Sequence, residues 1–383
     1  MDTRTDTQRQ IGERSPLVIR RVDAIPVGLP LKKAMAMAGS TVSRALNILV
    51  RIEAADGAVG WGEAASAPTM TGDTLGGLVA AVRDHLAPML VGEDAWRRPA
   101  LCRKLRRALY GNSGAHSAIE VALLDLAGQV SGLPLADLIG GAVRFEVAPM
   151  WLLGNLTPEQ DIVEAHGKRA DGFGFFKLKI GTKPVETEIA ATLALRNALG
   201  AEMPLCADAN CGLSFDDARR YLEETRAAGL MFVEQPLAHD DLAGLARLTR
   251  LSPTLIGADE GIHSLADVEE HKSCSVGGVS LKLIKLGGVS AAVEAAQLCR
   301  RLNLAVNVAA KIAESSIASA AAIHLACAAP AVEWGVSLTH FYLAEDVAKN
   351  PLAIGDGAVA LPAKPGLGIE VDEAAVERFR VVC

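Results

Sequence analysis

The sequence has few aromatic residues, no block of basic residues and no paired cysteine motif. Phe, Trp and Tyr make up 4% of the 383 residues while 50% are apolar, which predicts a core of Ala, Leu, Val and Ile. The 38 basic and 45 acidic residues give a net charge of −7, which argues against nucleic acid as a partner. The 7 cysteines are scattered without a CxxC pair, as expected for free thiols in a reducing cytoplasm.

Long hydrophobic runs and a leader peptide are also missing. Charged residues interrupt every apolar stretch before it reaches about 18 residues, so no membrane span is expected. Residues 1–15 are polar and lack the apolar segment of a signal peptide, so they are expected to be a disordered lead. The 8 histidines show no HxH or HxxxH spacing, which argues against a His-ligated zinc site.

Five short apolar runs in the second half of the chain each end in a charged residue. These residues are Lys179, Asp208, Glu234, Asp259 and Lys282, at intervals of 29, 26, 25 and 23 residues. A strand, a helix and two loops need about this much chain, so the spacing predicts repeated βα units. Eight strands are expected, the number that closes a (β/α)8 barrel, whose active site lies where the strands end. We place them at residues 148–153, 174–180, 203–208, 230–234, 254–259, 278–283, 304–309 and 331–335.

The predicted fold class is therefore α/β, a modified TIM barrel with an α+β capping domain. Residues 16–143 are expected to form the cap, because Asp56-Gly57 predicts a hairpin and residues 74–141 show helical spacing. Residues 32–41 and 64–74 are rich in small and polar residues and are expected to be loops, either plain surface loops or lids. The barrel is placed at residues 144–353, and residues 354–383 are expected to return to the cap.

Asp208, Glu234 and Asp259 follow consecutive predicted strands and should meet at one edge of the sheet. Carboxylates that converge suit a hard dication such as Mg²⁺, which leaves positions for a substrate oxygen. A single strand-end carboxylate can equally cap the next helix, but three in register favour a metal site. Asn210 and Glu260 are candidate outer partners of these ligands, or plain turn residues.

Lys177 and Lys179 lie two residues apart in the second predicted barrel strand, so their side chains share a face. We expect both to enter the barrel mouth, where positive charge and partial burial lower the pKa of one toward that of a useful base. An exposed strand face is the alternative. Lys282 follows the sixth strand, across the barrel, so one lysine can reach each face of a substrate. Lys285 is the second choice there, because it precedes Gly287-Gly288 and can simply anchor that turn.

Two residues after the seventh predicted strand are candidate substrate-binding groups. Glu314 is expected either to position the substrate or to stabilise the start of the next helix through its dipole. Lys311 is expected either to pair with a second anionic group of the substrate or to be an exposed surface lysine.

With these residues in place, the chain resembles the enolase superfamily and, within it, the muconate-lactonizing subgroup of the mandelate racemase/muconate lactonizing enzyme family. The motifs are FKLKIGTKPVE, CADAN, VEQP, GADE, SLKLIKLGG and PGLGIEVDE, within a resemblance that covers residues 17–382. The resemblance implies a cap made from both chain ends over a modified barrel with seven parallel helices. It also implies a cytoplasmic homo-oligomer, a dimer or an octamer.

The same resemblance implies roles for the candidate residues. Mg²⁺ or Mn²⁺ would be bound by the three carboxylates Asp208, Glu234 and Asp259. Lys179 and Lys282 would form the acid–base pair, and Lys177 would polarise the carboxylate of a small-molecule substrate.

The implied chemistry proceeds through a metal-stabilised enolate. The resemblance favours a cycloisomerase that forms a lactone from cis,cis-muconate or a related dicarboxylate, as in aromatic catabolism. Racemisation or epimerisation of an amino-acid derivative and dehydration of a hydroxy acid use the same lysine pair. The run AKIAES at residues 310–315 and the absence of a tyrosine from residues 64–74 depart from the usual cycloisomerase pattern. A catalytically silent binding protein on this scaffold is the remaining alternative.

Overall fold

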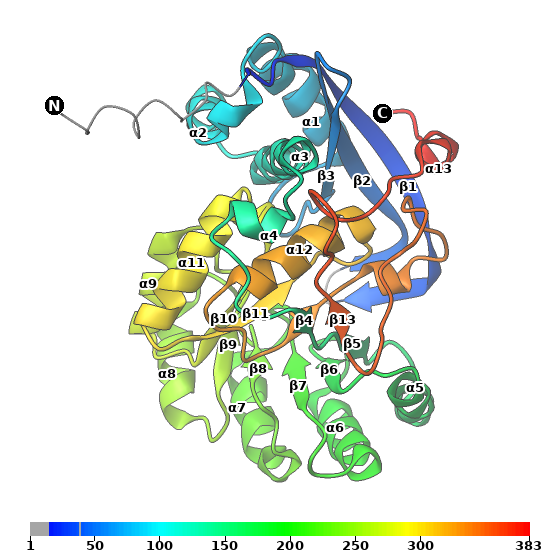
Figure 1. Cartoon of the computed structure of the whole chain (residues 1–383). Helices are drawn as coiled ribbons and strands as arrows, with labels where there is room; N and C mark the ends of the chain where they lie inside the picture. Colours follow the sequence, from blue (N-terminus) through cyan, green and yellow to red (C-terminus); the bar gives the residue numbers. More distant parts are fainter. Residues whose placement is uncertain (1–14, 38–39) are drawn as a thin grey trace, which may run out of the picture.

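The computed structural model describes residues 15–37 and 40–383, so residues 1–14 of the predicted lead lie outside the described part of the chain. A three-stranded antiparallel sheet with helices packed on it sits over one end of an eight-stranded parallel sheet (Figure 1). The predicted α/β class, a barrel with an α+β cap, is confirmed. In the described part of the chain, no helix is long and apolar enough to cross a membrane.

The parallel sheet closes into a barrel. Its strands pair in chain order from β5 to β12, and a parallel bridge between Pro149 and Val336 joins the first strand to the last. The strands are β5 (Met150–Leu153), β6 (Phe175–Lys179), β7 (Leu205–Asp208), β8 (Val233–Glu234), β9 (Ile256–Ala258), β10 (Gly278–Leu281), β11 (Ala305–Ala309) and β12 (Val336–Ser337).

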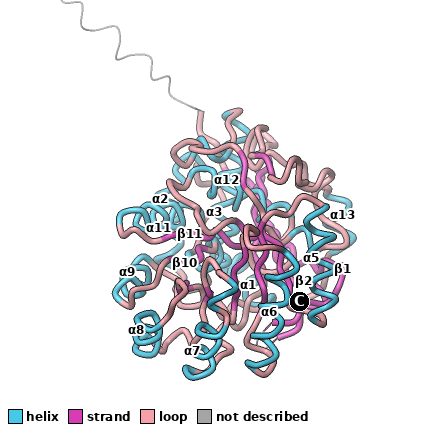
Figure 2. The backbone as a smooth tube through the Cα atoms, turned by 90° about the horizontal axis from the view of Figure 1, so that it is seen from below, coloured by secondary structure: helices cyan, strands magenta, loops and turns pink. Residues whose placement is uncertain are grey.

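Seven helices follow the first seven strands, and Figure 2 shows those from α6 to α9 outside the strands. They are α5 (Pro158–Ala170), α6 (Val185–Leu199), α7 (Phe215–Glu224), α8 (Leu242–Leu251), α9 (Leu265–Ser273), α11 (Val289–Arg301) and α12 (Ser316–Ala328), with a short α10 (Leu283–Leu286) before α11. Side chains cap the amino ends of several of them, because Thr157, Ser214, Ser264 and Ser315 each accept a hydrogen bond from the first turn.

The predicted position of the eighth strand is wrong. Residues 331–335 are expected from the sequence to form it, but β12 begins only at Val336. Gly335 has a φ of +77°, a conformation that turns the chain rather than extending it. Trp334, just before this turn, stacks on Phe232 with ring centroids 4.0 Å apart at the amino ends of the strands. Residues 331–335 resemble a strand in the sequence because they are mostly apolar, but they pack at the amino end of the barrel instead.

The capping sheet consists of β1 (Ile19–Met37), β2 (Ser40–Ala54) and β3 (Val59–Ala65), with Asp56 and Gly57 in the turn between β2 and β3. The expected loop at residues 32–41 is wrong for the described residues, since β1 and β2 continue pairing past a bulge as far as Met37 and Ser40. The other cap elements are α1 (Leu75–Ala80), a π-helical turn (Ala81–Leu86), 3₁₀ turns (Ala87–Met89 and Ala95–Arg97), α2 (Arg98–Ala108), α3 (Ser113–Ser131) and α4 (Leu135–Leu138).

The last residues of the chain lie against the capping sheet and against a short strand that precedes the barrel. Strand β13 (Val359–Ala360) pairs with β4 (Glu146–Val147), and α13 (Glu373–Phe379) packs on β1. The amide of Val381 donates to the carbonyl of Pro26 at 3.0 Å, so the chain end is tied to the capping sheet, as Figure 1 shows.

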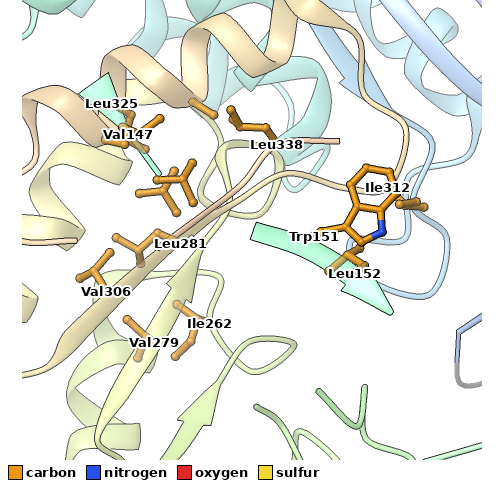
Figure 3. Close-up of a cluster of buried hydrophobic side chains, with 14 of the residues drawn as sticks. Val147, Trp151, Leu152, Ile262, Val279, Leu281, Val306, Ile312, Leu325 and Leu338 are labelled. Carbon is orange, nitrogen blue, oxygen red and sulfur yellow. The ribbon is translucent and has the colours of Figure 1, made fainter. Parts of the chain in front are cut away.

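Apolar side chains fill the interior of the barrel and its contacts with the surrounding helices. Figure 3 shows part of this core, in which Val279 and Leu281 of β10 lie near Val306 of β11. Because the interior is packed, polar side chains that open into the barrel can gather only at the mouth.

Candidate active site

Strand register brings the predicted charged residues side by side. Lys179 lies opposite Asp208, and Asp208 lies opposite Glu234 on the next strand. Glu234 in turn lies opposite Gly257, so Asp259, two residues further on, shares the face of that position. All three carboxylates are at most 2% exposed. The structure therefore gathers them at the carboxyl ends of three consecutive strands.

Each carboxylate faces at least one lysine. Lys179 Nζ lies 2.6 Å from Asp208 Oδ2, and Lys177 donates to Glu234 Oε2. Lys282 Nζ lies 2.5 Å from Asp259 Oδ2. Since Lys179 belongs to β6 and Lys282 follows β10, four strands along the closed sheet, amines enter the mouth from opposite walls. One cavity is lined by all six of these residues, and also by Asn210 and Lys311.

Burial and ion pairing act against each other on the lysine pKa values. Burial disfavours the charged form of Lys177, but Glu234 and Asp208 outweigh it, so its pKa is raised. The pKa of Lys282 is raised in the same way, because Asp259 outweighs burial. The lowering expected for one of the pair Lys177 and Lys179 is thus not found at Lys177, since carboxylates as well as amines crowd the mouth. The pKa of Lys311 is lowered, because burial outweighs the nearby carboxylate of Glu314.

Lys285, expected to be a second choice to Lys282 or a simple anchor of the turn at Gly287-Gly288, makes several contacts with Asp259. Its side chain is fully buried, and Nζ lies 2.6 Å from Asp259 Oδ1 and 3.3 Å from the carbonyl of Ser280. It also donates to the backbone carbonyl of Asp259. It does not line the cavity, so it supports Asp259 from behind while Lys282 faces the cavity.

Asn210 and Glu260 form a polar bridge beside the carboxylates. Asn210 Oδ1 accepts from Lys179 Nζ at 2.8 Å, and its Nδ2 donates to Glu260 Oε1 at 2.9 Å. Burial raises the pKa of Glu260 to about 7, and its Oε2 has no hydrogen-bond partner. Asn210 therefore lies in the cavity wall, whereas Glu260 lies behind it.

Lys311 and Glu314 lie on the turn that leads from β11 into α12. The amide of Lys311 donates to Glu314 Oε2 at 3.1 Å, so the two are locked into one turn. Lys311 lines the cavity beside the carboxylates, and Glu314 lines a smaller neighbouring cavity with Lys282. Burial raises the pKa of Glu314 to about 8.

Met70 and Thr339 line the cavity without having been predicted individually. Met70 belongs to the expected loop at residues 64–74, and its Sδ lies 3.9 Å from Lys282 Nζ. Thr339 Oγ1 donates to the carbonyl of Lys311 at 2.7 Å and accepts from the amide of Glu314. Neither a lone Met nor a lone Thr has a spacing pattern that could have marked it in the sequence.

Two family descriptions match this architecture. "Mandelate racemase / muconate lactonizing enzyme, N-terminal domain" matches residues 19–140, and "Enolase C-terminal domain-like" matches residues 161–375. The two matches correspond to the cap and to most of the barrel.

Individual proteins with these domains are similar along nearly their whole length. A chloromuconate cycloisomerase of Cupriavidus pinatubonensis is 32% identical over 358 residues, 92% of this chain and 96% of the relative. The L-Ala-D/L-Glu epimerase of Bacillus subtilis is 31% identical over 354 residues, with the same coverage of 92% and 96%. The crystal structure of muconate lactonizing enzyme from Pseudomonas fluorescens with muconolactone has a TM-score of 0.92 at 28% identity, covering 96% of this chain and 100% of that one.

These relatives share the cap, the barrel and isomerase activities on small carboxylates. The chain belongs to the mandelate racemase/muconate lactonizing enzyme family of the enolase superfamily, and it is an enzyme.

Proposed function

We propose that the chain is a divalent-metal-dependent cycloisomerase that converts cis,cis-muconate or a related dicarboxylate into a lactone. The observation that carries this proposal is a single cavity lined by three carboxylates from adjacent strands and by amines from opposite walls. The names of the relatives, cycloisomerases in most cases, support the same reaction class.

The donor chemistry of the cavity fits Mg²⁺ or Mn²⁺. Asp208, Glu234 and Asp259 offer only oxygen, and they lie close enough together that the charges of Asp208 and Asp259 both act to raise the pKa of Glu234. In the part of the chain that the structure describes, no cluster of three His, Cys, Asp or Glu side chains is arranged as a metal site. Each of the three carboxylates faces an ammonium group. We propose these three residues as the ligands. A dication held there would supply positive charge where an enolate develops.

The lysines supply the proton. In lactonisation, one carboxylate oxygen of the substrate adds to a double bond, a C–O bond forms and the π electrons move toward the other carboxyl group. The resulting enolate takes a proton at its α-carbon from an ammonium group. We assign this exchange to Lys179 or Lys282, since each reaches the cavity from its own wall, and we assign Lys177 to the substrate carboxylate. Lys311 would pair with the second carboxylate of the substrate.

Epimerisation is the second candidate, and the similarity to the L-Ala-D/L-Glu epimerase favours it. It needs both lysines, one to remove the α-proton and one to return a proton to the other face. The same pair of opposed amines serves this reaction.

One experiment separates the two. The purified chain with Mn²⁺ is incubated in D₂O with cis,cis-muconate and, separately, with acidic dipeptides. A cycloisomerase consumes muconate and places one deuterium in the lactone, whereas an epimerase exchanges the α-proton of a dipeptide. Lys179→Ala and Lys282→Ala should slow turnover by about 10²–10⁴-fold and still bind Mn²⁺, while Lys183→Ala, on the exposed loop after β6, should be active. Full activity in both pocket variants would contradict the proposed site.

A further inference from the structure

Asn47 and Glu63 form a buried polar pair on the capping sheet, and Glu63 lines the small cavity that Lys282 and Glu314 also line. Asn47 lies opposite Ala65 and Glu63 opposite Leu49, so the two are diagonal neighbours on one face of β2 and β3. They are 1% and 2% exposed, and Asn47 Nδ2 donates to Glu63 Oε1 at 2.7 Å. Two polar groups that are buried to this extent need partners beyond each other.

Those partners belong to the barrel. Glu63 accepts from the amide of Ser315 at 2.9 Å, from Ser315 Oγ at 2.6 Å and from the amide of Ala318 at 3.1 Å. Asn47 Nδ2 also donates to the carbonyl of Ala313 at 3.1 Å. The pair therefore grips the start of α12 and the turn before it.

That turn carries Lys311 and Glu314 and has an unfavourable shape. Ala313 has a φ of +61°, which a non-glycine residue adopts only where its surroundings hold it. On one side Thr339 holds the turn through Lys311 and Glu314. On the other side Asn47 and Glu63 hold Ala313 and Ser315. The turn keeps its shape because residues of the barrel and of the cap both form hydrogen bonds with it.

Glu63 is poorly explained as a plain stabilising residue. Among the described residues it takes part in no ion pair, although its carboxyl group is almost wholly buried. Buried ionisable groups without a counter-charge add little to stability. What the carboxylate does provide is a fixed acceptor for donors from the turn and from the first turn of α12.

We propose that Asn47 and Glu63 are positioning residues, through which the cap fixes the turn at residues 311–315 so that Lys311 faces the substrate cavity and Glu314 stays bound to the amide of Lys311. The effect on turnover rests on the function proposed above. The effect on the shape of the turn does not.

A second cap–barrel contact offers a matched control. Glu120 of α3 is 1% exposed, and it accepts from Ser290 Oγ at 2.6 Å and from the amide of Ser290 at 3.4 Å. It thus binds the start of α11 as Glu63 binds the start of α12, and unlike Glu63 it also pairs with Arg98 at 2.8 Å. Glu120 makes no contact with the turn at residues 311–315.

The test compares Glu63→Gln, Glu63→Ala and Asn47→Ala with Glu120→Gln in the full-length, Mn²⁺-loaded protein without substrate. Hydrogen–deuterium exchange is followed in peptides that cover residues 309–318. We expect exchange there to be at least about tenfold faster in Glu63→Ala and Asn47→Ala, with Glu63→Gln intermediate. Glu120→Gln should leave this region unchanged and loosen the start of α11. If Glu63→Ala is too unstable to purify, Asn47→Ala gives the same test.

Kinetics add a measurement that a purely structural role would not change. With the substrate found by the D₂O assay, Glu63→Gln should lower kcat/KM by about 10²-fold, because small misplacements of substrate-binding groups have effects of this size. In a Lys311→Ala/Glu314→Ala background, Glu63→Gln should lower kcat/KM by no more than about twofold, because the side chains that Glu63 positions are already gone.

Unchanged exchange at residues 309–318 in both Glu63→Ala and Asn47→Ala would overturn the proposal, and so would a full Glu63→Gln loss in the Lys311→Ala/Glu314→Ala background. Faster exchange without turnover of any substrate would support the positioning role and would count only against the proposed reaction.

Discussion

Lys285 lies directly behind Asp259 and binds it twice, through Oδ1 at 2.6 Å and through the backbone carbonyl. Lys282 reaches the other carboxylate oxygen, Oδ2, from the side of the cavity. The two lysines are three residues apart and pair with the same carboxylate, yet only Lys282 lines the cavity. Lys285 therefore fixes the orientation of the carboxylate, and Lys282 presents its ammonium group to the cavity.

Replacing Lys285 should destabilise the protein. Lys285→Met leaves a buried carboxylate with one of its two counter-charges, and loss of a partner from a buried pair costs about 3 kcal/mol or more. Urea unfolding would measure this loss. The exposed pair between Lys349 and Glu370 provides the control, since Lys349→Met should change the unfolding free energy far less than Lys285→Met does. Equal, small effects in both variants would show that Lys285 contributes no more than a surface lysine.

Replacing any of the three carboxylates should weaken metal binding more than replacing Asn210. Asn210→Ala removes a side-chain amide whose Nδ2 lies 3.5 Å from Asp208 Oδ2 and whose Oδ1 accepts from Lys179, and it should weaken Mn²⁺ binding by about 10–100-fold. Asp208→Asn, Glu234→Gln and Asp259→Asn each remove a proposed ligand and should weaken it further. Calorimetric titration with MnCl₂ gives the dissociation constants. Asp125→Asn, a buried carboxylate of the cap, should bind Mn²⁺ like the parent, and wild-type affinity in all three pocket variants would exclude this site.

A methyl group at Gly62 should disrupt the packing of α3 on the capping sheet. A Cβ at this position would lie 1.9 Å from the carbonyl oxygen of Ala118, a backbone atom that cannot move aside. Gly62→Ala should therefore cost about 3 kcal/mol or more of unfolding free energy. Gly76, in the first turn of α1, has no atom within 4 Å of the position that a Cβ would take, so Gly76→Ala should stabilise by about 0.5–1 kcal/mol. Thermal unfolding of the two variants should shift in opposite directions.

Asp125 should make stability depend on pH. It accepts hydrogen bonds from the amides of Trp61 and Leu367, but burial outweighs them and raises its pKa from 3.8 to about 6. The folded state therefore keeps a proton that the unfolded chain releases, and this stabilisation is lost as the pH rises from about 4 to about 7. Its contribution should be about 1.4 kcal/mol larger at pH 5 than at pH 7.5.

Asp125→Asn removes this titration. The difference in unfolding free energy between parent and variant should then change between pH 5 and pH 7.5 by that amount. A difference that stays constant over this range would mean that Asp125 is ionised in the folded state at both pH values.

The charged ends of the barrel strands could be predicted because the pattern is local and repeats. Each apolar run is followed within a residue or two by its charged residue, and parallel strands necessarily end at one face. The eighth strand could not be predicted, because the turn at Gly335 and the packing of Trp334 depend on contacts with Phe175 and Phe232 from distant parts of the chain. Glu63 was missed for a similar reason. Its partner Ser315 is 252 residues away, and a single carboxylate in a strand has no local signal of its role.

The bond between Val381 and Pro26 has a consequence for how the protein is made. Strand β1 leaves the ribosome before the barrel, and the segment that covers it leaves after the barrel. The cap therefore cannot be completed until residues 373–381 have been made, whereas the strands and helices of the barrel are all synthesised earlier. A chain that ended between the barrel and Val381 would have a complete barrel, which carries the candidate active site, beneath an incomplete cap.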